Sequence, residues 1–139
     1  MPDSININPQ LIADSIRNNF PDIAFAYLFG SAKEGVVKNG SDIDIAVYYK
    51  GSDAFIRLTV TEVLEQIVGR DIPIDVVELQ KANTLLAFEA ISGNLLFVRD
   101  NEMENYADFY TLTWRKYEDE AYRMKKQLEY RGYEVQWDS

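Results

Sequence analysis

The chain contains 139 residues, of which 47% are hydrophobic and 27% charged, ordinary fractions for a folded globular protein. Fourteen Lys and Arg against 23 Asp and Glu give a net charge of −9, which disfavours non-specific binding to nucleic-acid phosphates. The sequence has no cysteine and no histidine, which excludes disulfides, thiolate nucleophiles, Cys/His zinc sites and imidazole bases. Any catalysis therefore depends on carboxylates, hydroxyls, amines, backbone amides or a hard metal ion.

The length predicts one domain that spans residues 1–139. The longest unbroken apolar run, residues 23–29, is too short to cross a bilayer, and the N-terminus lacks the basic stretch of a signal peptide. We therefore expect a cytoplasmic protein with no membrane partner and no direct nucleic-acid partner.

Helix and strand signals alternate along the chain. In chain order we expect first a helix from Pro9 to before Pro21, capped by Asn8, then a strand over 23–29 and a helical turn between Gly30 and Gly35. A turn at 39–41 then leads into a strand over 42–49, which is followed by a helix capped by Ser52 or Asp53 and ended by Gly69. The remaining elements are a strand over 72–79, a helix over 84–92, a strand over 95–98 and a long helix from Met103 to about Tyr130. This order predicts an α/β protein with a mixed, twisted sheet of about four strands flanked by helices.

The final helix carries an apolar seam with a period of 3.5 residues. The seam consists of Met103, Ala107, Tyr110, Trp114, Tyr117, Ala121, Met124 and Leu128. One interpretation is that the helix covers the protein's own sheet. The other is that its exposed end, with Trp114 and several tyrosines, docks on a partner helix. Both interpretations can be correct for different parts of the helix.

Three aspartates lie on strands with apolar neighbours. Asp42 and Asp44 are two residues apart at the start of one predicted strand, so both side chains project from the same face. Asp75 lies between Ile74 and Val76 on the next predicted strand and faces away from that strand's apolar side. If the two strands are neighbours, the three carboxylates converge on one patch.

Converging carboxylates need a counter-ion, because two of them about 4–5 Å apart repel by roughly 3–4 kcal/mol at an effective dielectric of 20. Mg²⁺ prefers carboxylate and phosphate oxygens, and a pair of such ions assists phosphoryl displacement. Gly30-Ser31 follows a strand and opens a helical turn, so its backbone N–H groups can approach a phosphate and the Ser31 hydroxyl can donate to one.

These residues form a recognisable pattern. Leu28-Phe29-Gly30-Ser31, ten further residues, and then Asp42-Ile43-Asp44 resemble the signature of the DNA polymerase β-like nucleotidyltransferases. The short chain, the third acidic strand and the closing helix are similar to the minimal nucleotidyltransferase subfamily, the MntA-type antitoxins paired with HEPN-domain toxins in type VII systems. The resemblance implies the nucleotidyltransferase fold with a long C-terminal helix.

The resemblance also implies the chemistry and the site. Asp42, Asp44 and Asp75 would bind Mg²⁺, with two ions expected, and Asp75 would help to deprotonate the attacking hydroxyl. The nucleotide would be held by Gly30, Ser31, Lys33 and Ser41. The implied reaction transfers AMP from ATP to a tyrosine hydroxyl of a HEPN ribonuclease toxin, with which the chain would form a hetero-oligomer.

The sequence departs from the subfamily at one position. Members commonly carry a basic residue just before the glycine at Gly35, where this chain has Glu34 and the nearest cation is Lys33. Two alternatives stay open at this stage. The chain could be a non-catalytic antitoxin that neutralises by binding, or a nucleotidyltransferase with a small-molecule acceptor, although such enzymes usually carry a second domain.

Overall fold

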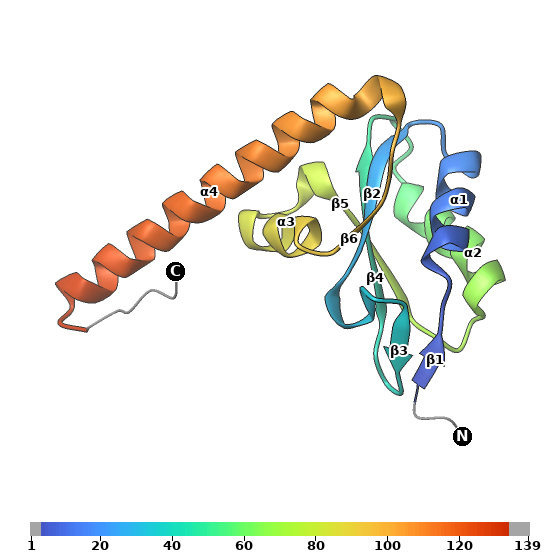
Figure 1. Cartoon of the computed structure of the whole chain (residues 1–139), viewed down its shortest axis with the longest axis horizontal. Helices are drawn as coiled ribbons and strands as arrows, with labels where there is room; N and C mark the ends of the chain where they lie inside the picture. Colours follow the sequence, from blue (N-terminus) through green and yellow to red (C-terminus); the bar gives the residue numbers. More distant parts are fainter. Residues whose placement is uncertain (1–3, 134–139) are drawn as a thin grey trace.

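The computed structural model describes residues 4–133 and is built around a four-stranded mixed sheet (Figure 1). The strand order is β5-β4-β2-β6, with β2 antiparallel to β4 and to β6, and β4 parallel to β5. The strands are β2 (Ile23–Phe29), β4 (Ile43–Tyr49), β5 (Ile74–Glu78) and β6 (Asn94–Val98).

Helices cover both faces of this sheet (Figure 1). Helices α1 (Pro9–Asn19) and α2 (Ile56–Val68) contribute to the core on one face, and α3 (Thr84–Ile91) and α4 (Met103–Tyr130) contribute to the core on the other. Three short 3₁₀ turns connect elements: η1 (Gly30–Ala32), η2 (Leu79–Lys81) and η3 (Asp100–Glu102). The mixed α/β architecture predicted from the sequence is confirmed.

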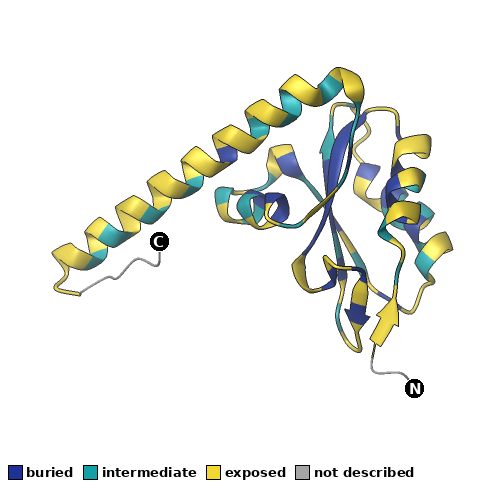
Figure 2. Cartoon of the chain, viewed as in Figure 1, coloured by how far each residue is buried: buried dark blue, intermediate teal, exposed yellow. Residues whose placement is uncertain are grey.

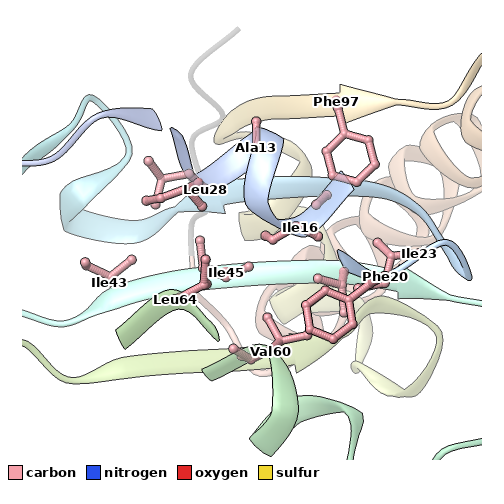
Figure 3. Close-up of a cluster of buried hydrophobic side chains, with 14 of the residues drawn as sticks. Ala13, Ile16, Phe20, Ile23, Leu28, Ile43, Ile45, Val60, Leu64 and Phe97 are labelled. Atoms are coloured by element: carbon pink, nitrogen blue, oxygen red, sulfur yellow. The ribbon is translucent and has the colours of Figure 1, made fainter. Parts of the chain in front are cut away.

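The first core lies between the sheet and helices α1 and α2 (Figure 3). Ile16 of α1 and Val60 of α2 are fully buried against Leu28 and Ile45 of the central strands. Full burial of one such side chain stabilises the fold by about 1.5–3 kcal/mol. This core therefore keeps β2 and β4 rigid, and the candidate site lies at the ends of these two strands.

The second core is rich in aromatic side chains. Phe25 of β2 stacks on Tyr48 with ring centroids 4.7 Å apart, and it meets the ring of Tyr106 edge-on at 5.3 Å. Phe109 of α4 lies 5.8 Å from the same Phe25 ring. Aromatic pairs of this kind contribute about 0.5–1.5 kcal/mol beyond area burial, so they anchor the first turns of α4 on the sheet.

The predicted start of the first helix and the long final helix are confirmed. The Asn8 side chain accepts a hydrogen bond from the Gln10 backbone N–H at 3.0 Å, which satisfies one of the free donors of α1. The strand predicted over 23–29 has those bounds, and α4 spans Met103–Tyr130 as expected. Gly69 ends α2 with a φ of +88°, a conformation that favours glycine.

One expectation was wrong, and one small sheet was not predicted. The second helix begins at Ile56 and is not capped by Ser52 or Asp53, because the Asp53 side chain instead accepts the Phe55 N–H in the preceding turn. The structure also contains a small antiparallel sheet of β1 (Ser4–Asn6) and β3 (Val36–Lys38), which the sequence analysis did not predict. Each strand has three residues, too few for an alternating pattern to be visible.

Helix α4 covers the sheet with its first half only and then extends beyond α3 (Figure 1). Tyr106, Phe109 and the buried Thr113 lie on the side that faces the protein. Most of the second half is exposed (Figure 2). The interpretation that α4 covers the protein's own sheet is thus confirmed for its first half. Among residues 4–133, no helix combines the length and the apolar character that crossing a membrane needs.

Candidate active site

The corner after β2 brings the backbone close to an aspartate. Gly30 has a φ of +72°, in the left-handed region, and starts the 3₁₀ turn η1. A Cβ atom at this position would collide with Oδ2 of Asp44, so any other residue would displace this carboxylate. Ser31 follows on the exposed surface of the turn. The structure therefore places the Gly30-Ser31 corner directly beside Asp44.

The strand register aligns the aspartates. Asp44 pairs with Phe29 on the antiparallel side and with Asp75 on the parallel side of β4. Residues in register on neighbouring strands project from the same face of a sheet, so the Asp44 and Asp75 carboxylates lie next to each other. Asp42 precedes β4 by one residue and has the same parity as Asp44. All three aspartates lie at the sheet end where β2 leads into Gly30.

The carboxylates interact unfavourably in the absence of a cation. Burial raises the pKa of Asp44, and the negative charges of Asp75, Asp42 and Glu89 raise it further. Within residues 4–133, none of the three aspartates forms an ion pair with a lysine or arginine. The site thus gathers negative charge that the described part of the protein leaves uncompensated.

This donor set fits a hard divalent cation. With the side chains as they stand, no group of three or more acidic residues in the described range is close enough to enclose an ion alone. Mg²⁺ does not require such a cage, because it usually binds one or two carboxylates together with substrate phosphates and water. Asp44 and Asp75, in register and unpaired, provide carboxylates of this kind.

A shallow hollow of about 270 Å³ lies beside the Gly-Ser corner. It is lined by Gly30, Lys33, Phe88, Glu89, Ser92 and Gly93. Gly93 allows the close approach of α3 to β2, since a Cβ there would lie 2.6 Å from the Leu28 carbonyl oxygen. Lys33 is exposed and lies next to Glu34 along an adjoining hollow. The corner, the hollow and one lysine are therefore contiguous.

Ser41 is placed differently from the other predicted nucleotide-binding residues. It lies in the turn before β4, where its N–H donates to the Lys38 carbonyl at 2.9 Å. It lines a separate cavity of about 460 Å³ with Asp71 and Pro73, not the hollow beside Gly30. The structure brings together Gly30, Ser31 and Lys33 but leaves Ser41 in another hollow.

Sequence reasoning missed two residues of this region, Phe88 and Glu89. Both belong to α3, and both line the hollow. A signal existed for Glu89, because it is the one charged residue in the otherwise apolar stretch of α3. No local signal placed α3 against the end of β2, since that contact joins segments far apart in the chain.

A family model described as "Polymerase beta, Nucleotidyltransferase" matches residues 10–102, about two-thirds of the chain. The chain belongs to this nucleotidyltransferase family. Among its relatives is the protein adenylyltransferase MntA of Shewanella oneidensis, which is 30% identical over 103 residues, or 73% of each chain.

Solved structures agree with this assignment. A toxin-antitoxin structure with AMP-PNP matches with a TM-score of 0.65 and 26% identity, over 88% of this chain and 94% of that chain. A tri-AMPylated Shewanella oneidensis HEPN toxin in complex with an MNT antitoxin matches with a TM-score of 0.58 and 25% identity, over 88% and 93%. The family and fold predicted from the sequence are therefore confirmed.

Proposed function

We propose that this chain is a Mg²⁺-dependent protein adenylyltransferase, a single minimal nucleotidyltransferase domain that acts as the antitoxin of a type VII pair. It transfers AMP from ATP to a tyrosine hydroxyl of a HEPN ribonuclease toxin and forms a hetero-oligomer with that toxin in the cytoplasm. The relative named protein adenylyltransferase, the structure with AMP-PNP and the complex of an AMPylated HEPN toxin support this proposal.

One observation carries the proposal. Gly30, Asp44 and Asp75 lie side by side across three adjacent strand ends, on one face of the sheet. The glycine side offers backbone N–H groups and Lys33 for phosphates, and the aspartate side offers oxygens for Mg²⁺. At this end of the sheet, a nucleoside triphosphate would therefore meet both the proposed phosphate-binding residues and the proposed metal ligands.

In the reaction, the acceptor oxygen forms a bond with the α-phosphorus of ATP. The bond from this phosphorus to the oxygen that bridges to the β-phosphorus breaks, and pyrophosphate leaves with the electron pair. We assign Asp42, Asp44 and Asp75 as metal ligands, and Asp75 also as the acceptor of the hydroxyl proton. Bound Mg²⁺ would supply positive charge that offsets the charge developing on the phosphate oxygens.

The remaining assignments concern the nucleotide. Ser31, on the exposed side of the η1 turn, donates its hydroxyl to a phosphate oxygen, and Lys33 provides a positive charge at the rim of the hollow. We also propose Ser41 as a nucleotide contact because it directly precedes Asp42 in the chain, although it lines another cavity. Glu34 faces the same region with a negative charge and weakens the electrostatic attraction of triphosphate.

The test is to incubate the chain with ATP, Mg²⁺ and the HEPN-domain toxin of the proposed pair, and to measure the mass of the HEPN protein. We expect a gain of one or more AMP units, abolished in the D42A/D44A double variant and retained in a D22A control at an exposed aspartate. An unchanged mass with the wild-type chain would refute the proposed activity.

The exposed apolar seam of α4 favours a second candidate, neutralisation by binding alone. The same double variant separates the two candidates in cells that express the toxin. If AMP transfer is the mechanism, the D42A/D44A variant forms the complex but does not restore growth. If binding suffices, the double variant protects as well as the wild-type chain.

A further inference from the structure

The apolar seam of α4 is largely exposed. Met103 is 53% exposed and Met124 is 64% exposed, and Tyr110 and Trp114 also remain partly open to solvent. The side of α4 that packs on the sheet is instead formed by Tyr106, Phe109 and Thr113. The seam lies beside this contact face. Its middle, Trp114 and Tyr117, packs on Phe88 of α3, and its ends near Met103 and Met124 remain exposed.

The spacing of the seam indicates the shape of what covers it. Its members alternate between intervals of four and three residues from Met103 to Leu128, a distance of about 38 Å at 1.5 Å per residue. A helix keeps such a seam facing one direction only when a second helix packs along it, knob into hole. The pattern thus fits a helical partner better than a loop or a sheet edge.

The middle of the seam connects to the candidate active site. Tyr117 stacks on Phe88 with ring centroids 3.7 Å apart, and Trp114 meets the same ring edge-on at 4.8 Å. Phe88 in turn lines the hollow together with Gly30 and Lys33. The Phe88 side chain therefore links a protein that covers the seam to the hollow where the nucleotide is proposed to bind.

We propose that the apolar seam is the docking surface for a helix of the AMP-accepting toxin, an inference that rests on the proposed function. The continuity through Phe88 places the acceptor beside the hollow. The net charge of −9 opposes the approach of a second copy of this chain and favours a partner with a basic surface. Docking on the seam would thus bring the acceptor hydroxyl to the nucleotide while the partner is held by α4.

The test uses the full chain and places lysine on or off the seam. The seam variant is M124K/L128K, and the matched control is Y122K/Y130K, which adds the same charge to other faces of the same helical half. Affinity for the HEPN-domain toxin of the proposed pair is measured by titration calorimetry. Binding of a fluorescent ATP analogue and the far-UV spectrum report whether each variant keeps its hollow and its helix.

We expect the seam variant to bind the HEPN protein at least tenfold more weakly, with analogue binding unchanged, while the control stays within about twofold of the wild-type chain. Equal affinity of the seam variant and the wild-type chain would overturn the inference. It would also be overturned if the isolated wild-type chain were a dimer that the seam variant disrupts, with toxin binding intact. Absence of AMP transfer by a wild-type chain that binds through the seam would refute the proposed function only.

Discussion

Replacement of Asp44 by Asn should stabilise the fold while it removes activity. Asp44 is half-buried and lies in register with Asp75, and Asp42 and Glu89 add further negative charge. Two carboxylates about 5 Å apart repel by roughly 0.8 kcal/mol in water and roughly 3 kcal/mol at an effective dielectric of 20. Because Asp75 is exposed and solvent screens the pair, we expect a gain of about 1–2 kcal/mol.

The gain is measured as a Tm in EDTA at pH 7.5. One kcal/mol corresponds to roughly 3–5 °C for a chain of this size, so the D44N variant should melt about 3–10 °C above the wild-type chain. A D22N control at an exposed aspartate should change the free energy of unfolding by less than about 0.5 kcal/mol. Added Mg²⁺ should raise the Tm of the wild-type chain more than that of D44N.

The pH dependence has a defined sign. The pKa of Asp44 is raised in the folded state, so the folded protein takes up this proton more readily than the unfolded chain. Stability from this group is therefore present at low pH and is lost as the pH rises through the folded pKa. The advantage of D44N should shrink as the pH is lowered from 7.5 towards the raised folded-state pKa of Asp44, and a Tm of D44N at or below the wild-type value at pH 7.5 would refute the reasoning.

Three further substitutions each test a single contact or charge. G30A should reduce AMP transfer at least tenfold, because its Cβ displaces Asp44 and the φ of +72° is costly for alanine; transfer at the wild-type rate would contradict this. E34K should lower the KM for ATP several-fold, with kcat nearly unchanged, because it replaces a negative charge by a positive one near the proposed phosphate-binding residues. An unaltered KM would show that the charge of Glu34 does not affect nucleotide binding. R99A should cost about 2–3 kcal/mol in urea unfolding without changing the KM, because its guanidinium donates to three backbone carbonyls around the α1–β2 connection; unchanged stability would show those bonds to be dispensable.

Local signals were sufficient for most of the architecture. The cap at Asn8, the glycine stop at Gly69 and the apolar run 23–29 depend on residues within a few positions of each other, so the sequence carries them completely. The two exceptions have different causes. The β1–β3 pair gains its stability from contacts between distant segments, and the Asp53 side chain satisfies a nearby turn instead of the helix end.

The candidate site was predictable in composition but only in part in its arrangement. The two-residue spacing of Asp42 and Asp44 predicts that both face one way where the backbone is extended, and Asp42 lies one residue before β4. Nothing in the spacing determines that β5 pairs with β4 in a register that puts Asp75 opposite Asp44. The sequence thus predicted which carboxylates belong to the site, and the pairing of β4 with β5 places Asp44 and Asp75 next to each other.

The amino-acid sequence by itself determined the longer helices and strands, the family signature and the apolar seam of α4, because each depends on periodicity or spacing along the chain. Only the tertiary structure decided that Gly30 lies against Asp44, that Glu89 adds its charge, and that Phe88 joins the hollow to the seam. The physical reason is that these contacts join separate elements, and their energies arise from strand register and helix packing, which local residue patterns do not encode.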